Sequence, residues 1–187
     1  MYYAQMFDYG SDQNHVGITG ILGCMGVVFV AAGHLYAIHI PDMVNSNLVG
    51  AMAFVAMVQG GEGALHPAGS LHLFVNGMKR LTADDEARTM KDALGGPPTR
   101  VCRVMTGLPM APNGEPASVT IKVQLVAGVA QMVYKHVPDD QWVAGGNART
   151  GRYLGTLADD PTRPNDGELA AAWNPVTSAA CHIRGIH

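Results

Sequence analysis

The segment that most constrains the fold of this chain runs from Gly23 to His39 and holds two strand-like runs on either side of Ala32-Gly33. Both runs are rich in Val, Phe, Tyr and Ile, and two such runs joined by a short loop that contains glycine predict a β-hairpin. Cys24 opens the first run and His39 lies near the end of the second. The segment therefore predicts a hairpin that carries a thiol and an imidazole.

The length of the turn decides whether these two side chains meet. If Ala32-Gly33 is a two-residue turn, His39 lies opposite Gly26 and shares a face with Cys24 as its diagonal neighbour, with Cα atoms roughly 7–8 Å apart. His34 then points to the other face. A three-residue loop would send Cys24 and His39 to opposite faces, because side chains alternate along a strand.

A thiol within reach of an imidazole is the minimal apparatus for covalent acyl chemistry. The histidine can take the thiol proton and leave a nucleophilic thiolate. A free cysteine that begins an apolar strand is, however, more often a small buried hydrophobic residue. Two interpretations are therefore open: Cys24 is a nucleophile, or it belongs to the core of a binding protein that performs no catalysis.

The hairpin also resembles a known catalytic element. A Gly-Cys pair, a strand, a short glycine turn, a second strand and a histidine 15 residues after the cysteine are similar to the catalytic hairpin of the glutamine deamidase superfamily. This group includes the cytotoxic necrotizing factor catalytic domain, the Burkholderia lethal factor and the chemoreceptor glutamine deamidase. Leu22-Gly23-Cys24 stands where these families have a turn such as Leu-Ser-Gly-Cys, and the resemblance covers roughly residues 17–50.

The resemblance implies a protein-glutamine deamidase in which Cys24 is the nucleophile and His39 the general base, with no metal or organic cofactor. An amine in place of water would give transglutamination. Some members orient the histidine with a threonine six residues before the cysteine, where this chain has Ile18, and Thr19 is the nearest hydroxyl. Other members use a main-chain carbonyl. Thr19, a backbone oxygen and an unidentified residue therefore all stay open as the orienting group.

The resemblance further implies a bacterial toxin or secreted effector that acts on another protein, with a host regulatory protein as one candidate target. A chemoreceptor-type glutamine deamidase is the alternative with the same chemistry. Recognition of the target would fall to loops such as 107–117 and 138–167, which carry no known motif.

Composition limits the other function classes. The net charge is −3 and the basic residues are scattered, so nucleic-acid binding has little support. Three cysteines without a close pair favour reduced thiols and a reducing compartment. The first residues lack a basic segment followed by a long apolar one, so no conventional secretory signal is visible. We expect a bacterial cytoplasmic protein, or one secreted by another route into the cytosol of a target cell, and no membrane span, because 21–40 fits a hairpin better.

The chain of 187 residues fits a single domain. We expect an α/β fold with a mixed, largely antiparallel central β-structure, sandwich-like, and flanking helices. Residues 1–140 would form the catalytic domain and residues 141–187 an irregular segment packed on it or extending from it. The expected elements are strands at 70–75, 100–105, 118–125 and 129–137, helices at 46–59, 82–94 and, at most, 168–173, and an irregular lead-in over 1–20 with one short strand. Helix 46–59 is apolar almost all round and is expected to pack deeply against the hairpin.

The other candidate residues favour structural roles. His72 alternates with leucines and is expected to be half-exposed on a strand, and Cys102 is expected in the core. Cys181 has no evident base nearby. The acidic run Asp84-Asp85-Glu86 is better explained by the positive end of a helix than by acid catalysis. A zinc site that uses Cys24 or Cys181-His182 is a minor alternative.

Overall fold

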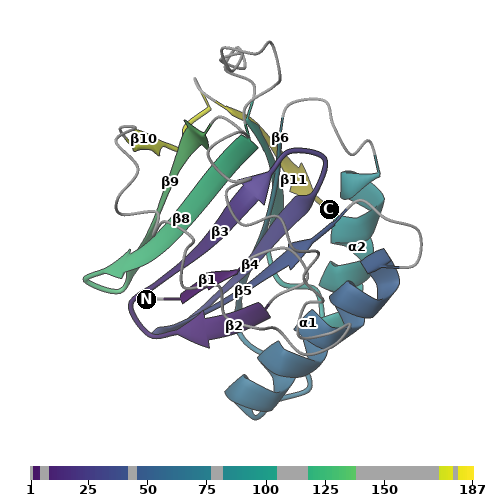
Figure 1. The fold of residues 1–187 in the computed structure, drawn as a ribbon. Helices are drawn as coiled ribbons and strands as arrows, with labels where there is room; N and C mark the ends of the chain where they lie inside the picture. The colour runs from purple at the N-terminus through teal and green to yellow at the C-terminus, as the bar shows by residue number, and fades with distance from the viewer. Residues whose placement is uncertain are drawn as a thin grey trace, which may run out of the picture.

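Two β-sheets and two helices make up the described parts of the chain in the computed structural model shown in Figure 1. The structure describes residues 2–4, 9–41, 46–76, 82–104, 118–137, 173–178 and 181–187. In chain order the elements are β1 (Tyr2–Ala4), β2 (Tyr9–Asp12), β3 (His15–Ile21), β4 (Met25–Ala31), β5 (His34–Ile40), α1 (Ser46–Glu62), β6 (Gly69–Asn76), α2 (Ala83–Ala93), β7 (Thr99–Val104), β8 (Ser118–Val126), β9 (Val129–Val137), β10 (Asn174–Pro175) and β11 (Cys181–Ile186).

Most neighbouring strands are antiparallel. Sheet A has five strands in the order β1-β3-β8-β9-β10, and sheet B has six in the order β11-β7-β6-β4-β5-β2. The pairs β1–β3 and β6–β7 are parallel. The fold is therefore a mixed α/β arrangement dominated by largely antiparallel sheets, which confirms the mixed, largely antiparallel part of the expectation. The share of sheet is larger than expected, because five strands precede the first helix.

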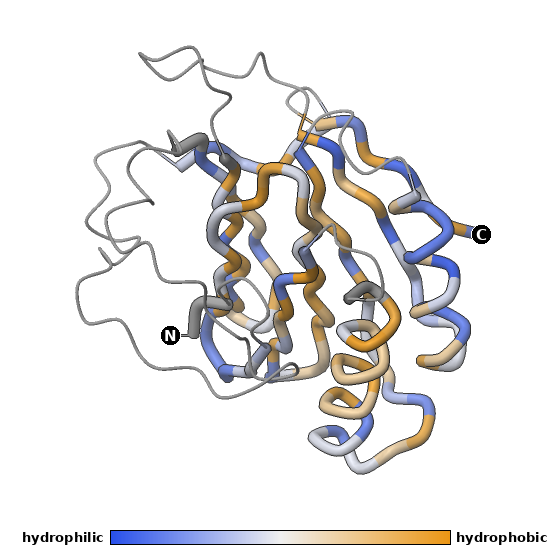
Figure 2. Tube along the Cα trace, turned by 45° about the vertical axis from the view of Figure 1, so that its right-hand side comes forward, coloured by the Kyte–Doolittle hydropathy of each residue, from blue (hydrophilic) through white to orange (hydrophobic). Residues whose placement is uncertain are grey.

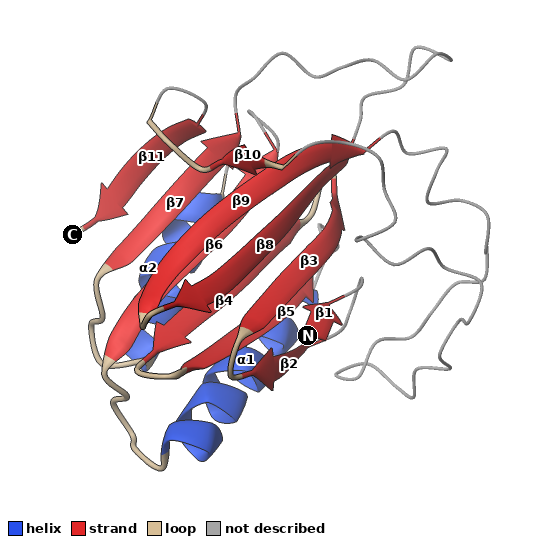
Figure 3. Ribbon diagram, turned by 90° about the vertical axis from the view of Figure 1, so that its left-hand side faces the viewer, coloured by secondary structure: helices blue, strands red, loops and turns tan. Residues whose placement is uncertain are grey.

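The elements lie in three layers. Figure 3 shows sheet A in front of sheet B, with both helices behind sheet B. One apolar cluster joins side chains of the two sheets, among them Val28, Ala37 and Phe74 of sheet B and Ile18 and Ile121 of sheet A. A second cluster joins the opposite face of sheet B to the helices. Sheet B is thus covered on both faces, and this explains the continuous apolar runs of its central strands.

The hairpin forms with the register expected for a two-residue turn. Ala31 lies opposite His34 and Gly26 opposite His39, so Ala32 and Gly33 alone connect the strands. Gly33 has a φ of 82°, a left-handed conformation that glycine adopts without steric cost. The helices at 46–59 and 82–94 and the hairpin 118–137 are confirmed as α1, α2 and β8–β9.

The N-terminal region is more regular than expected. Residues 1–20 were expected to be an irregular lead-in with one short strand, but they contain β1, β2 and most of β3. The register of β3 against β8 shifts between Ile18 and Ile21, and Gly20 has a φ of 70° there. This bulge interrupts the alternation of apolar and polar residues, so β3 does not look like a strand in the sequence.

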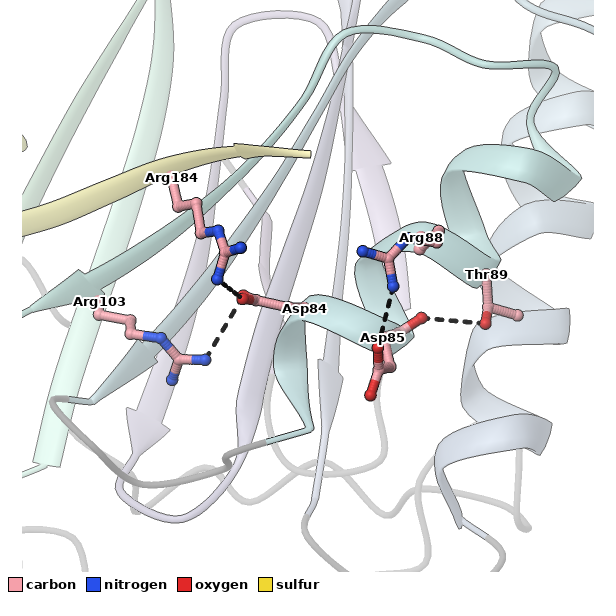
Figure 4. Close-up of polar contacts among 6 residues, drawn as sticks. All are labelled: Asp84, Asp85, Arg88, Thr89, Arg103 and Arg184. Atoms are coloured by element: carbon pink, nitrogen blue, oxygen red, sulfur yellow. Dashed lines mark hydrogen bonds and ion pairs between the residues drawn. The ribbon is translucent and has the colours of Figure 1, made fainter. Parts of the chain in front are cut away.

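The C-terminal segment is not irregular throughout, which corrects the expectation for 141–187. β10 pairs with β9, and β11 forms the edge of sheet B beside β7. Figure 4 shows how Asp84 of α2 secures this edge: its carboxylate lies 2.8 Å from Arg184 of β11 and 3.5 Å from Arg103 of β7. Asp84 therefore has a structural role. The loops 107–117 and 138–167, and residues 168–172 of the expected short helix, lie outside the described residues.

Helix α1 packs less deeply than expected. Phe54 and Val58 are buried against sheet B, but Leu48 and Met52 are 62% and 63% exposed. Figure 2 shows α1 in more hydrophobic colours than α2. Because the helix is apolar on several sides and only one side meets the sheet, part of its apolar surface faces outward. Among the described residues, the helices are too short or too polar to cross a membrane.

Candidate active site

Cys24 lies in the bend between β3 and β4, one residue before β4 begins. Its exposed fraction is 9%. The preceding residues, Leu22 and Gly23, are half-buried, and a Cβ atom added to Gly23 would meet nothing within 4 Å. The thiol is therefore largely enclosed, and the backbone just before it borders open space.

His39 lies near the end of β5, directly opposite Gly26 of β4, and only 1% of it is exposed. Two residues further along each strand, Val28 and Ala37 belong to the cluster between the sheets. Because side chains alternate along a strand, His39 faces sheet A, and Cys24 shares that face when the alternation of β4 is continued by one residue. The pairing of β4 with β5 thus has the register that the two-residue turn predicts, and Cys24 lies one residue before this pairing begins.

Side chains of sheet A close over the gap beside His39. A Cβ atom on Gly26 would lie 2.7 Å from Cδ1 of Ile21 and 2.9 Å from Cδ1 of Ile18. Only glycine fits such a close approach. His39, directly opposite Gly26, therefore borders apolar side chains of sheet A.

Thr19 is not brought to this face. It lies in the bulge of β3 together with Gly20, and these two residues stand opposite Thr120 of β8. Its neighbours Ile18 and Ile21 both point to the cluster between the sheets, so Thr19 points to the outer face of sheet A. Its hydroxyl is buried there and has no hydrogen-bond partner among the described residues. The bulge, which the sequence does not reveal, separates Thr19 from His39.

The second histidine of the hairpin faces the other way. His34 pairs with Ala31, which belongs to the cluster between sheet B and the helices. Its ring centroid lies 4.8 Å from that of Tyr36 on the same face. The expectation that His34 points away from Cys24 is confirmed.

The other two cysteines are buried in the layer between the sheets. Cys102 is 2% exposed and Cys181 3% exposed. Burial raises the pKa of the Cys102 thiol to about 12 and also raises the pKa of Cys181. The expected core position of Cys102 is confirmed.

His72 is buried, which corrects the expectation of a half-exposed residue. It is 6% exposed and one ring nitrogen lies 2.8 Å from the Ser70 hydroxyl. Burial lowers the pKa of His72 to about 4, and Arg100, opposite it on β7, acts in the same direction. Sheet A covers this face of β6 and buries His72. The alternation of His72 with leucines does not reveal this burial, because sheet A is formed by other segments of the chain.

Two further features add to the description of the site. In the part of the chain that the structure describes, no three His, Cys, Asp or Glu side chains gather as metal ligands would. Asn76, which Gly77 follows in the sequence, is the last residue of β6 and is fully buried. An Asn-Gly pair is typical of turns, so the sequence does not indicate that Asn76 is a buried strand residue.

An apolar hollow lies on the opposite side of sheet B. It runs between α1 and α2 with a volume of about 230 Å³, and Leu48, Met52 and Met90 are among its lining residues. It is separated from Cys24 and His39 by sheet B itself, because those side chains face sheet A. The hollow therefore does not contribute to the Cys24–His39 site.

Comparison with known proteins adds no family: the chain matches no family model and no curated protein.

Proposed function

We propose that this protein is a cysteine-dependent protein-glutamine deamidase with Cys24 as nucleophile and His39 as general acid and base. The observation that supports the proposal is the register of the hairpin, in which His39 lies opposite Gly26 and so shares a face with Cys24. The resemblance of this hairpin to that of the glutamine deamidase superfamily supplies the reaction. The layered, largely antiparallel arrangement is compatible with the sandwich-like fold expected for a member.

The reaction proceeds through a thioester. His39 takes the proton of the Cys24 thiol, and the Sγ–C bond forms at the carboxamide carbon of the substrate. The C–N bond then breaks while His39 returns the proton to the departing ammonia. A water activated by His39 attacks the thioester, the S–C bond breaks, and glutamate and the free thiol result. The backbone N–H of Cys24 donates to the oxyanion.

The enclosure of the site favours a side-chain substrate. A cysteine residue that is only 9% exposed is difficult to reach for a peptide bond within a folded backbone. A glutamine carboxamide stands at the end of a thin, flexible stem and can enter where the backbone at Gly23 borders open space. Since Thr19 faces away, we assign the orientation of His39 to a backbone oxygen or another residue.

The biological setting follows from the resemblance. A toxin or secreted effector that modifies a protein in the cytosol of a target cell is our first choice. A bacterial cytoplasmic enzyme that deamidates chemoreceptors is the alternative. Transglutamination by the same thioester is a further expected activity when an amine replaces water.

A non-catalytic binding protein is the second candidate function. It is favoured by the low exposure of Cys24 and His39, 9% and 1%, and by the outward-facing Leu48 and Met52 beside the apolar hollow. In that case Cys24 is a core residue and binding occurs on the helix side of sheet B.

The experiment that separates these candidates follows the substrate. The protein is incubated with lysate of a candidate target cell, and mass spectrometry is used to detect conversion of specific glutamines to glutamate. We expect conversion by the wild type and by Cys102→Ser, and none by Cys24→Ser. Equal conversion by wild type and Cys24→Ser would show that the activity has another source, and no conversion by any of them would favour the binding protein.

A further inference from the structure

Asn76 is a fully buried polar residue at the end of β6. β6 pairs with β4 on the side opposite to β5, and Met25 of β4 lies opposite Val75. Continuing this antiparallel register by one residue places Asn76 directly opposite Cys24. Residues in such a pair have Cβ atoms roughly 4.5–5.5 Å apart, which is within the reach of a carboxamide group.

Asn76 also shares the face of the proposed site. Phe74, two residues earlier on β6, belongs to the cluster between the two sheets, and alternation gives Asn76 the same orientation. Cys24 is thus flanked by His39 on the β5 side and by Asn76 on the β6 side. On β7, the other neighbour of β6, the residue in register with Asn76 is Val104. This side chain is apolar and offers no hydrogen bond to the amide.

This position rules out a role for Asn76 in orienting His39. The two residues lie on strands that flank β4 on either side, which separates their backbones by roughly 10 Å. The space between them, over Gly26, is filled by Ile18 and Ile21. Asn76 can therefore act on Cys24 or on a group bound to its sulfur, but not on the imidazole.

We propose that Asn76 is a second oxyanion donor of the deamidase, an inference that rests on the function proposed above. As Cys24 Sγ bonds to the carboxamide carbon, the π electron pair of the carbonyl moves onto its oxygen, and Asn76 Nδ2–H donates a hydrogen bond to that oxygen. The pair returns when ammonia leaves. A neutral amide donor held in a buried site is suited to this task, because it stabilises the developing charge without titrating.

Two reactions of Cys24 distinguish this role from a structural one. Iodoacetamide alkylates the thiolate by displacement and forms no oxyanion, whereas p-nitrophenyl acetate acylates it through a tetrahedral oxyanion. Asn76→Asp keeps the shape of the side chain but removes the amide donor, and Asn76→Leu keeps most of its volume without charge. His72→Gln is the matched control, a buried polar residue on the same strand and face.

The expected result is a selective loss of acylation. Asn76→Leu should acylate at Cys24 more slowly by roughly tenfold or more, while its alkylation of Cys24 stays close to the wild-type rate. Asn76→Asp should slow both reactions, because its carboxylate also disfavours the thiolate, and His72→Gln should retain both. Acylation of both Asn76 variants at the wild-type rate would overturn the role of Asn76 and leave the Cys24–His39 proposal standing. Loss of alkylation together with acylation in Asn76→Leu would also overturn it, because Asn76 would then only support the structure. A wild-type protein that is not acylated at Cys24 would overturn the deamidase proposal and this inference with it.

Discussion

The three cysteines lie in different environments. Cys24 lies one residue before β4 beside the open space at Gly23, whereas Cys102 and Cys181 are almost fully buried between the sheets. Burial raises the pKa of Cys102 to about 12 and also that of Cys181. Because the thiolate is the reactive form, iodoacetamide near neutral pH should modify Cys24 first in the folded protein. Mass-spectrometric mapping over time measures the order, and a Cys24 that reacts last would contradict the catalytic proposal.

The two histidines of the hairpin provide a matched pair of variants. His39 shares the face of Cys24, while the ring of His34 lies tilted against that of Tyr36 on the helix side of sheet B. His39→Ala should lower turnover by roughly 10²–10⁴-fold through loss of the general base, and His34→Ala should leave it nearly unchanged. Rates of ammonia release from the target protein provide the measurement. An essential His34 with a dispensable His39 would refute the assignment of the base.

At the scale of single residues, the sequence allows side chains to be paired within the hairpin. It does not show which residues from other strands lie next to a given side chain. Cys24 and His39 are related by one short turn, so the register can be counted along the chain. The environments of Thr19, His72 and Asn76 depend on a bulge and on the second sheet. Those contacts come from segments far away in the sequence, and no local pattern reports them.

Two adjacent glycines near the end of α1 should respond in opposite directions to alanine. A Cβ atom at Gly60 would meet nothing within 4 Å, but at Gly61 it would lie 2.8 Å from Cε1 of Tyr36, whose hydroxyl donates to Glu62 at 2.6 Å. Gly60→Ala should therefore raise the free energy of unfolding by about 0.5–1 kcal/mol through the helix preference of alanine. Gly61→Ala should lower it by about 1 kcal/mol or more, because Tyr36 must shift.

Urea unfolding of both variants beside the wild type checks this prediction. Each replacement adds the same methyl group to the same helix, so each variant controls for the other. Equal shifts of the two unfolding midpoints would show that α1 does not contact Tyr36 as described.

At the scale of elements, local signals identify those whose partners are close in the chain. The hairpins β4–β5 and β8–β9 each form across a two-residue turn, and the helices α1 and α2 follow their expected spans closely. β3 and β11 pair with strands far away in sequence, and both were missed. These residues form strands because their backbone N–H and C=O groups make hydrogen bonds with a strand that is distant in the sequence.

The stability of the whole molecule should depend on pH through His72. Burial lowers the pKa of His72 from 6.5 to about 4, so the unfolded chain binds a proton at this residue in a range where the folded protein does not. The part of the unfolding free energy that depends on neutral His72 is complete above about pH 6.5. It is lost as the pH falls toward 4. The loss can reach about 3 kcal/mol of unfolding free energy.

Urea unfolding at about pH 7 and about pH 4.5 measures this dependence. His72→Phe should lose less stability between the two pH values than the wild type does. His182→Gln, at an exposed position, should keep the wild-type dependence. Equal pH dependence in all three proteins would mean that His72 is solvated in the folded state.

The sequence by itself determined the hairpin, because turn chemistry and strand alternation act between near neighbours. It left open whether Cys24 and His39 share a face, and the structure has the two-residue turn that puts them on one face. The sequence also determined both helices and the apolar character of the layers. Only the tertiary structure decided how closely sheet A covers His39, which way Thr19 points, and that Asn76 is buried at the end of β6. These features arise when strands separated along the chain are brought into register, and the energy that fixes them comes from packing between the layers rather than from any local preference.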